Sequence, residues 1–375
     1  MIIGLLKDPP FEKRVALLPE TVVLLKKLNV DILVETGAGV KAFVSDADYQ
    51  EAGATVVSRD AVFDKAEVLV KINPFTSDEV IALKSGQVIL AVLNPFQHKE
   101  LVTQLAAAGI TAFSLDVIPR ISRAQSMDVL SSMATVAGYR AVLDAALHLP
   151  KFFPMFMSAA GTIRPAKVLI LGAGVAGLQA VAVSRKLGAV VEVFDVRSAV
   201  KDEVQSLGGK FIEVAGAVDD KAAGGYAVEQ TEEFKQKQRQ LIHDHAVKAN
   251  VVITTAQIPG KQAPVLLTKE TVEQMTPGSV VVDMAASTGG NCEVTQNDQV
   301  IEHHGVTIIG KSDYPSDMPF DASKMFGNNV LNFLKLIISK EGNLYLNFED
   351  DIVKGTCVTH DKQVVNDRVK QLLNL

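Results

Sequence analysis

The chain has 375 residues, of which 48% are hydrophobic and 21% are charged, and this balance is typical of a folded α/β protein rather than a disordered one. Its length is more than one ordinary core needs and favours two domains. The formal net charge of −6 gives no electrostatic support for nucleic-acid binding. The two distant cysteines, Cys292 and Cys357, exclude a disulfide framework and indicate a reducing compartment.

Neither a targeting segment nor a membrane span is expected. The first residues, MIIGLLKDPPFEKR, combine acidic residues with prolines and do not resemble a secretory signal. The longest apolar run, from Val168 to Val183, is interrupted by three glycines and Gln179, so it is too short and too polar to span a membrane. It predicts a strand, a tight turn and a helix instead.

The N-terminal third of the chain alternates short apolar runs with amphipathic segments. The predicted helices include Pro19–Leu28 and Lys99–Ala108. Strands that alternate with helices indicate a parallel, doubly wound sheet. The predicted strands are Ile2–Leu6, Asp31–Glu35, Val68–Ile72, Val88–Leu93 and Thr111–Leu115.

A long helix from Val129 to Leu149 is predicted to follow and to stop at Pro150. Six further strands come after it, with a glycine turn after the first, and this pattern predicts a second doubly wound sheet with strand order 3-2-1-4-5-6. These strands are Lys167–Leu171, Val190–Asp195, Lys210–Val214, Asn250–Thr255, Ser279–Met284 and Val306–Ile309.

A third region, Asp321 to Lys340, has apolar residues at helical spacing, and we expect this helix to return and pack on the first domain. The predicted fold class is α/β, with two doubly wound parallel-sheet (Rossmann-like) domains linked by long helices. The predicted domains are residues 1–128 plus 320–375, which form a discontinuous first domain, and residues 129–319. The loop Gly216 to Gln230 is unusually long, and long polar loops in compact domains are usually functional or mobile.

A dinucleotide-binding fingerprint opens the second domain. The segment VLILGAGVAGLQA places Gly172, Gly174 and Gly177 in a G-x-G-x-x-G arrangement between an apolar strand and the predicted helix Val175–Leu187. The first glycine permits a tight turn, the second lets a pyrophosphate approach the backbone, and the third allows close packing of helix on strand. The free N–H groups at the start of the helix would hold the phosphates.

An acidic residue at the end of the next strand selects between the two nicotinamide dinucleotides. In VVEVFDVR this residue is Asp195, whose carboxylate would accept hydrogen bonds from ribose hydroxyls and repel a 2′-phosphate. The nearby Arg197 is a residue type that can accept a 2′-phosphate. Because Asp195 ends the strand, we expect NAD(H) rather than NADP(H).

None of the histidines is predicted to form a catalytic or metal site, and no metal is expected. Adjacent residues do not share one face of a strand, so His303 and His304 are expected to be a solvated loop pair. His243 and His245 are expected on the surface of a polar helix. His98 is expected to cap or start a helix, and a catalytic role is the alternative for it because it closely follows a strand.

A polar segment, IPRISRAQSMDVLSS, joins the last strand of the first domain to the long helix. It contains Arg120, Arg123, Gln125, Asp128 and Ser131. We expect Gln125 and Asp128 to form hydrogen bonds with the carboxamide and ribose at the nicotinamide end of the dinucleotide, with Arg120 holding Gln125 or Asp128 in place. The alternative is an ordinary linker with helix-capping residues, and the spacing supports both equally.

With these motifs the chain resembles the NAD(H)-binding component (domain I, alpha subunit) of proton-translocating NAD(P) transhydrogenases. The resemblance covers nearly the whole chain. Besides the segments above, it rests on RVALLPETV, GGYA, TTAQIPGKQAP, VVVDMAASTGGNCEVT and FGNNVLNFLKL.

The resemblance implies roles for the site residues. Arg120, Gln125, Asp128 and Ser131 would position the nicotinamide without acting as acids or bases, and Tyr226 would fold over the nucleotide on a mobile loop, Gly216 to Gln230. The residues predicted to contact NAD(H) are Gly172, Gly174, Val175, Ala176, Gly177, Asp195, Val196, Arg197, Gly225, Tyr226, Thr255 and Ala256.

The resemblance also implies partners. A separate component would hold NADP(H), and a membrane component would couple hydride transfer to proton movement. The chain would be a homodimeric oxidoreductase that is active only with these components. It would be cytoplasmic and peripheral on the inner face of the membrane through them.

Alanine dehydrogenase shares this architecture and is the main alternative. Arg14 and Lys71 match its substrate-binding arginine and lysine. Its catalytic histidine, however, would fall near Asn94 and its catalytic aspartate at Ser287, and neither asparagine nor serine can titrate near neutral pH. Oxidation of an amino acid needs a proton acceptor, whereas hydride transfer between two nicotinamides does not. The sequence therefore favours transhydrogenase over an amino-acid dehydrogenase. A non-catalytic NAD(H)-binding module is the third possibility.

Overall fold

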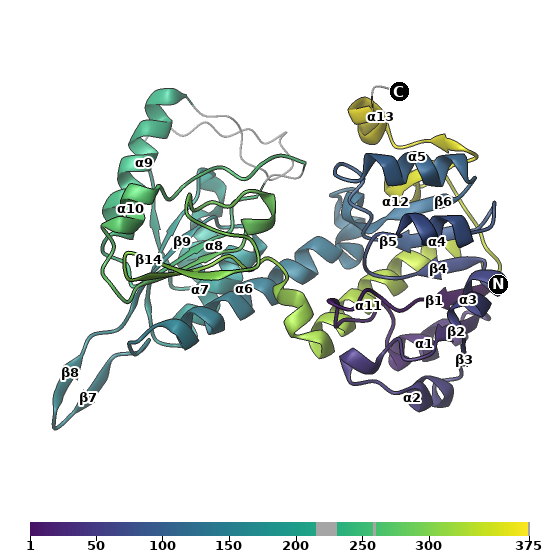
Figure 1. The fold of residues 1–375 in the computed structure, drawn as a ribbon, viewed down its shortest axis with the longest axis horizontal. Coiled ribbons are helices and arrows are strands. Elements are labelled where there is room, and N and C mark those ends of the chain that lie inside the picture. The colour runs from purple at the N-terminus through teal and green to yellow at the C-terminus, as the bar shows by residue number, and fades with distance from the viewer. Residues whose placement is uncertain (215–230, 258–259, 374–375) are drawn as a thin grey trace. The chain divides into compact units, whose positions relative to one another are not determined.

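The computed structural model describes residues 1–214, 231–257 and 260–373. It divides into two compact units, of which unit 1 contains Met1–Met133 with Pro315–Leu375 and unit 2 contains Ala134–Tyr314 (Figure 1). Each unit is built on a mainly parallel sheet with helices on both faces, so the predicted α/β, doubly wound fold class is confirmed.

The sheet of unit 1 has the strand order β17-β16-β6-β5-β4-β1-β2-β3. The five predicted strands are confirmed to within two residues, and they run parallel as β1 (Ile2–Leu5), β2 (Asp31–Glu35), β4 (Val68–Val70), β5 (Val88–Ala91) and β6 (Thr111–Ser114). Three further strands, at the two ends of this sheet, were not predicted. They are β3 (Thr55–Val57), β16 (Cys357–His360), which runs antiparallel to β6, and β17 (Gln363–Val364).

Helices cover both faces of the unit 1 sheet. One face packs α1 (Pro19–Lys26) and α11 (Pro319–Ile337), and the other packs α3 (Arg59–Lys65), α4 (Ser77–Ala82) and α5 (Lys99–Ala107). The return of α11 to the first sheet is confirmed, since Phe333 lies 5.2 Å, centre to centre, from the ring of Phe113 on β6. The shorter helices begin at side-chain caps, and both α2 (Asp46–Glu51) and α4 have complete capping boxes.

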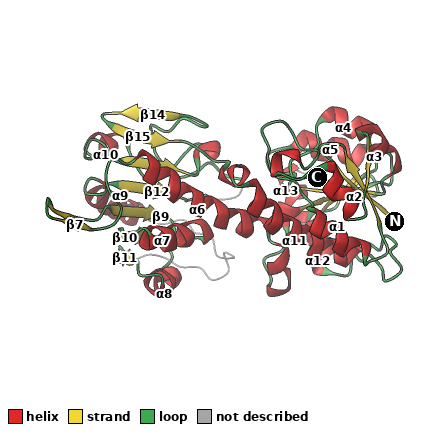
Figure 2. Ribbon diagram, turned by 90° about the horizontal axis from the view of Figure 1, so that it is seen from below, coloured by secondary structure: helices red, strands yellow, loops and turns green. Residues whose placement is uncertain are grey.

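The sheet of unit 2 has the predicted 3-2-1-4-5-6 order, here β11-β10-β9-β12-β13-β15 (Figure 2). An antiparallel strand that was not predicted, β14 (Val300–His303), adds to the β15 edge. A separate hairpin, β7 (Phe156–Ser158) and β8 (Gly161–Ile163), extends away from the rest of the unit (Figure 1). The parallel strands are β9 (Lys167–Leu171), β10 (Val190–Phe194), β11 (Lys210–Ile212), β12 (Val251–Thr254), β13 (Val280–Asp283) and β15 (Val306–Ile309).

The predicted long helix is α6 (Val129–His148), which packs with α7 (Val175–Lys186) on one face of the unit 2 sheet. The other face is covered by α9 (Glu232–Ala246) and α10 (Lys269–Glu273). The remaining helices are α8 (Lys201–Ser206), α12 (Asp351–Thr356) and α13 (Asp367–Leu373). Among the described residues, no helix is long and apolar enough to cross a membrane.

Candidate functional site

The glycine-rich turn connects β9 to α7, and its three glycines have different surroundings. Gly172 has a φ of +107°, a conformation that glycine adopts readily and other residues rarely do. A Cβ on Gly177 would lie 1.9 Å from the carbonyl oxygen of Gly172, so the helix could not pack this closely on the turn with any other residue there. A Cβ on Gly174 would meet no atom of the described residues within 4 Å.

This turn has the form needed to hold a pyrophosphate. Gly174 is the N-cap residue of α7, no side chain of the described residues caps the helix, and the first N–H groups are left for a ligand. A 12-residue helix also presents the positive end of its dipole there. The space in front of Gly174, next to exposed Val175, is where a phosphate group would approach the backbone.

Asp195 lies against this turn, just after β10. Its carboxylate accepts hydrogen bonds from the Ala173 amide at 2.7 Å and from the Arg197 amide at 2.8 Å. The Arg197 guanidinium donates two more, from Nε at 2.9 Å and from Nη2 at 2.7 Å. These donors already engage both carboxylate oxygens, so a ribose hydroxyl could bond Asp195 only by sharing an oxygen or by displacing the arginine.

Two further predicted residues, Thr255 and Ala256, follow β12 on the other side of the turn. The Thr255 hydroxyl donates to the Gly172 carbonyl at 3.1 Å, which ties the two strand ends together. The Ala256 amide donates to Oδ1 of Asn291 at 3.0 Å, while Nδ2 of Asn291 donates to the Ala256 carbonyl at 2.9 Å. Asn291 is fully buried, and sequence reasoning missed it.

A buried carboxylate, Asp283, fixes the segment that carries Asn291. It accepts hydrogen bonds from the Thr254 hydroxyl at 2.9 Å, the Cys292 amide at 2.9 Å and the Thr295 hydroxyl at 2.8 Å. Sequence reasoning missed this residue too. The available signal was an acidic residue at the end of an otherwise apolar strand, where a buried charge needs several donors.

The polar segment of unit 1 forms a 3-10 helix, η3 (Ser122–Met127), followed at once by α6. Asp128 caps α6, since its carboxylate accepts from the Ser131 amide at 2.9 Å and from the Ser131 hydroxyl at 2.6 Å. Helix capping, the alternative raised from the sequence, is therefore present. Arg120 and Gln125 are exposed on the same segment.

Helix α11 supports η3 through two amide side chains that the sequence did not single out. Asn329 and Asn332 both donate through Nδ2 to the carbonyl of Ser126, at 2.8 and 3.2 Å. On the other side, the Arg123 guanidinium forms two hydrogen bonds, of 2.6 and 2.7 Å, with the Asp350 carboxylate. The main-chain path of η3 is therefore held at both ends.

The predicted residues fall into two groups. The glycine turn, Asp195, Arg197, Thr255 and Ala256 are brought together in unit 2. Arg120, Gln125, Asp128 and Ser131 share one segment that begins α6 and belongs to unit 1. Gly225, Tyr226 and the rest of the predicted loop, Gly216 to Gln230, lie outside the described residues.

The residues that matched alanine dehydrogenase are engaged within unit 1. Arg14 forms an ion pair with Glu12 at 2.6 Å, and Lys71, 1% exposed, forms one with Glu79 at 2.9 Å. Asn94 has a φ of +48°, and its amide donates to Asp116 at 3.4 Å. Burial raises the pKa of Asp116 above its ordinary value, against the opposing hydrogen bonds from the Ser114 hydroxyl and from backbone amides.

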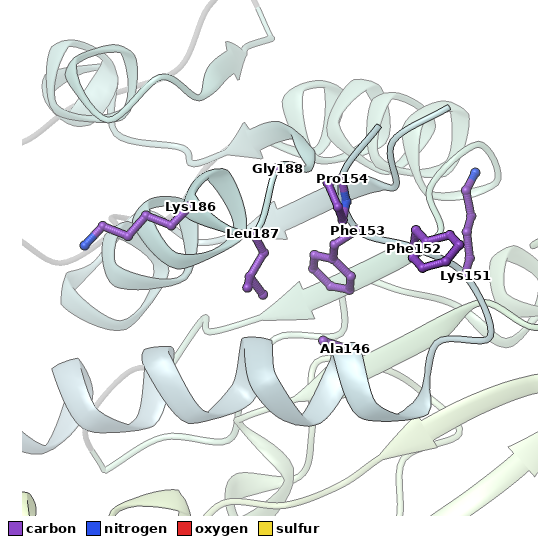
Figure 3. Close-up of a pocket in the computed structure, with 8 residues that line it drawn as sticks. All are labelled: Ala146, Lys151, Phe152, Phe153, Pro154, Lys186, Leu187 and Gly188. Carbon is purple, nitrogen blue, oxygen red and sulfur yellow. The ribbon is translucent and has the colours of Figure 1, made fainter. Parts of the chain in front are cut away.

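Unit 2 also has an open hollow on its surface (Figure 3). It adjoins the C-terminal end of α7, about 18 Å along the helix from the turn at its N-terminal end. The hollow is lined by Ala146, Lys151, Phe152, Phe153, Pro154, Lys186, Leu187 and Gly188. It is therefore not part of the dinucleotide site.

Comparison with known proteins agrees with this geometry. The family models described as alanine dehydrogenase/PNT, N-terminal and C-terminal domain, match residues 7–137 and 141–367. The chain is 46% identical over 370 residues to the first part of NAD(P) transhydrogenase subunit alpha of Rhodospirillum rubrum, with 95% of each chain covered. It is 29% identical over 353 residues to alanine dehydrogenase of Bacillus subtilis, covering 91% of this chain and 86% of that one. The crystal structure of transhydrogenase from Sinorhizobium meliloti superposes with a TM-score of 0.89 at 42% identity, covering 97% of this chain and all of the other.

Proposed function

The chain belongs to the alanine dehydrogenase/PNT family and, within it, to the NAD(P) transhydrogenase alpha subunits, and on this premise we propose that it binds NADH and passes hydride directly to NADP⁺ held on a partner component. The observation that carries the proposal is the pair Asn94 and Ser287. The resemblance to alanine dehydrogenase would put its catalytic histidine near Asn94 and its catalytic aspartate at Ser287, and neither asparagine nor serine can accept a proton near neutral pH.

The residues of unit 2 hold the dinucleotide in this proposal. The amides at the start of α7 bind the pyrophosphate in the open space beside Gly174. Asp195 accepts a hydrogen bond from the adenosine ribose once Arg197 has released an oxygen of its carboxylate. The same carboxylate repels a 2′-phosphate, which favours NAD(H) over NADP(H).

The residues of η3 and the start of α6 act on the nicotinamide. Gln125 and Asp128 donate to and accept from the carboxamide and the adjoining ribose, while Arg120 orients them. When bound, NADH supplies the hydride at C4 of its nicotinamide. Transfer between two nicotinamides moves no proton, so the task of these side chains is orientation and the exclusion of water rather than acid–base chemistry.

The decisive experiment mixes the purified chain with an NADP(H)-binding transhydrogenase component and follows hydride exchange by stopped-flow absorbance. We expect little turnover by the chain alone and rapid exchange in the mixture. Gln125→Asn should slow exchange at least about tenfold, while NADH still binds through its adenosine end. Exchange at the wild-type rate in this variant would contradict the positioning role.

Two other outcomes would overturn the proposal. Reduction of NAD⁺ by L-alanine with the chain alone would make it an amino-acid dehydrogenase. Binding of NADH without exchange in the presence of the partner component would make it a non-catalytic NAD(H)-binding module.

We further propose that the chain is a homodimer and that it is cytoplasmic, held at the inner face of the membrane by the NADP(H)-binding and membrane components. All six residues of the β7–β8 hairpin are exposed. Phe156 and Met157 are 48% and 71% exposed, and the Phe156 ring stacks on Phe152 at 5.4 Å. A lone two-stranded hairpin with this much exposed apolar surface indicates a covering partner, which we assign to a second copy of the chain.

A further inference from the structure

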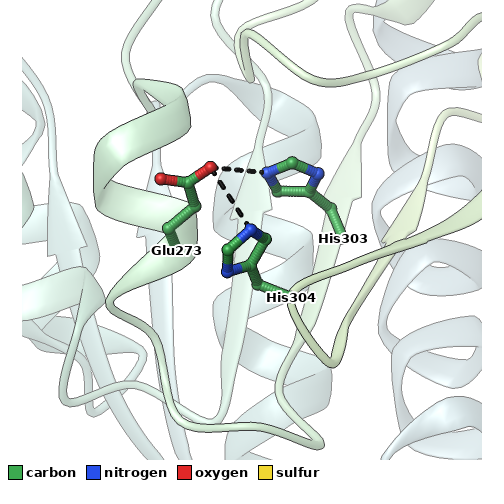
Figure 4. A group of neighbouring side chains, drawn as sticks. All are labelled: Glu273, His303 and His304. Carbon is green, nitrogen blue, oxygen red and sulfur yellow. Dashed lines mark hydrogen bonds and ion pairs between the residues drawn. The ribbon is translucent and has the colours of Figure 1, made fainter.

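Three potential metal ligands converge at the edge of the unit 2 sheet, away from the glycine turn. They are Glu273 at the end of α10, His303 at the end of β14, and His304 in the turn between β14 and β15. Among the described residues these are the one group of three histidine, cysteine or acidic side chains that could hold an ion together. Both imidazoles turn toward the same carboxylate (Figure 4).

The expectation of a solvated loop pair is wrong for His303. This residue ends a strand, its side chain is 23% exposed, and it contacts Glu273. A tight turn makes the convergence possible. His303 pairs with Val306 across the β14–β15 ladder, so His304 and Gly305 are the two residues of the hairpin loop. Their φ values of +51° and +74° are those of a type I′ turn. In such a turn the side chains no longer alternate between the two faces of a strand, so His303 and His304 can point toward the same side.

The scaffold holds the turn beside α10. The Gly278 amide, in the segment that follows α10, donates to the Gly305 carbonyl at 2.7 Å. The same segment leads into β13, which pairs in parallel with β15. The two elements that carry the three side chains are therefore fixed to one another by main-chain hydrogen bonds, and only the side chains have to adjust to a ligand.

The distances suit a tetrahedral ion. Nε2 of His303 lies 3.2 Å from Oε1 of Glu273, and Nε2 of His304 lies 3.5 Å from the same oxygen. Zinc ligands at about 2.0–2.2 Å in a tetrahedron are separated from each other by about 3.3–3.6 Å. All three ligand atoms lie within 4.8 Å of one another, and His304, 58% exposed, has room to rotate inward.

We propose that Glu273, His303 and His304 bind a divalent transition-metal ion of the zinc class, with water as a fourth ligand. Two neutral imidazoles and one carboxylate suit Zn²⁺, Co²⁺ or Ni²⁺, whereas Mg²⁺ and Ca²⁺ take oxygen ligands. Such an ion joins α10 to the β14–β15 hairpin. Without the ion, the two imidazoles contact the Glu273 carboxylate as seen here, and the Lys269 ammonium lies 3.9 Å from Oε1 of Glu273.

The first test is calorimetric titration of the metal-free, untagged full chain with Zn²⁺. We expect one ion per chain, no competition by Mg²⁺, and the visible absorption of tetrahedral cobalt when Co²⁺ replaces zinc. The absence of Zn²⁺ binding at micromolar concentrations would overturn the proposal. No nucleotide is needed, so the result is independent of the proposed hydride transfer.

The second test uses variants that keep the fold. In His304→Asn the new residue suits a type I′ turn, and in Glu273→Gln the shape of the side chain is retained, so both should fold normally. Each should weaken zinc binding at least about tenfold. A loss of this size is the lower limit that is typical even for residues that only hydrogen-bond to a metal ligand. Lys269→Gln should tighten binding, because it removes the competing cation.

A matched control is available in the same unit. Nδ1 of His245 lies 2.6 Å from Oε2 of Glu192, so these residues also form a histidine–carboxylate pair. Among the described residues, no second histidine is close enough to complete a metal site with this pair. His245→Gln should therefore leave zinc binding unchanged. Equal binding by the wild type and by His304→Asn, or equal losses in His304→Asn and His245→Gln, would overturn the assignment of the site.

Discussion

Gly174 and Gly177 belong to one motif but are required for opposite reasons. The space that a Cβ would need at Gly177 is occupied by the Gly172 carbonyl oxygen, whereas the space at Gly174 is clear of the described residues and would be filled by a phosphate. Gly177 is therefore needed for packing, and we propose that Gly174 is needed for binding. Single alanine substitutions separate these two requirements.

Gly174→Ala should lower the thermal unfolding temperature much less than Gly177→Ala, because its methyl group meets no atom of the described residues within 4 Å and only the N-cap preference for glycine over alanine is lost. It should weaken NADH binding about tenfold or more, because the methyl group intrudes on the ligand. Gly177→Ala should lower the free energy of unfolding by about 1–3 kcal/mol and also weaken binding. The clash is with backbone, so it should outweigh the gain of about 1 kcal/mol that alanine usually brings to a helix. Differential scanning fluorimetry and NADH fluorescence titration check both results. Normal NADH affinity in Gly174→Ala would contradict the proposed phosphate position.

Asp116 allows a prediction about pH. Burial raises the pKa of this carboxyl in the folded protein above the ordinary value of 3.8. The folded chain then holds a proton that the unfolded chain has released, so the contribution of Asp116 to stability falls as pH rises from about 3.8 through the raised pKa.

Asp116→Asn should remove this decline, and its stability should fall less than that of the wild type between pH 4 and pH 7. A pKa difference of one between the folded and unfolded states corresponds to about 1.4 kcal/mol. Urea unfolding at both pH values measures the effect, and the comparison of variant with wild type cancels other buried carboxyls such as Asp8. Parallel pH profiles of the two proteins would disprove the prediction.

At the scale of elements, the junction of η3 and α6 has an observed structural role and a functional role that we propose. Asp128 is a helix cap, yet it lies in the segment that we propose to orient the nicotinamide. The carbonyl of Ser126 is fixed by two asparagines of α11, which places the exposed Gln125 on a supported turn. The capping role of Asp128 and its proposed contact with the ligand can be tested separately. Serine at this position would still cap the helix, because serine also caps helices well.

Asp128→Ser should therefore keep α6 and most of the stability, whereas Asp128→Ala should lose about 0.5–2 kcal/mol. If Asp128 also contacts the nucleotide, both variants should slow hydride exchange with the partner component at least about tenfold. Chemical denaturation and stopped-flow exchange measure the two effects separately. Exchange at the wild-type rate in Asp128→Ser would reduce Asp128 to a cap.

At the scale of the whole molecule, the β7–β8 hairpin is the feature that a single chain does not explain. Its side chains contribute little to either core, and the stacked rings of Phe152 and Phe156 lie beside the hollow lined by Phe153 and Leu187. Four of the residues that line the hollow, 151–154, directly precede the hairpin along the chain. A second copy would bury both.

The double variant Phe156→Gln, Met157→Gln should convert a dimer into a monomer, or raise its dissociation constant about tenfold or more, without changing the unfolding of the single chain. Light scattering coupled to gel filtration measures the mass. Phe43→Gln is the matched control, since Phe43 is 81% exposed but belongs to unit 1. A wild-type chain that is monomeric at micromolar concentrations would contradict the homodimer.

Much of the fold was predictable because its signals are local. An apolar strand, a glycine turn and a helix lie within about twenty residues, and Asp195 ends the next strand, so the strand order and the position of the dinucleotide turn followed from sequence patterns. The edge strand β14 was missed because it is partly exposed and lacks a continuous apolar run.

The tertiary structure alone decided which distant side chains meet. Asn291 clamps Ala256 from 35 residues away, Asn329 holds Ser126 from 203 residues away, and Glu273 reaches His303 from 30 residues away. The sequence determined the types and order of elements because hydrogen bonding and hydrophobic periodicity act between near neighbours. Contacts such as these depend on the exact turn and on the packing of helices against sheets, and no spacing along the chain encodes them.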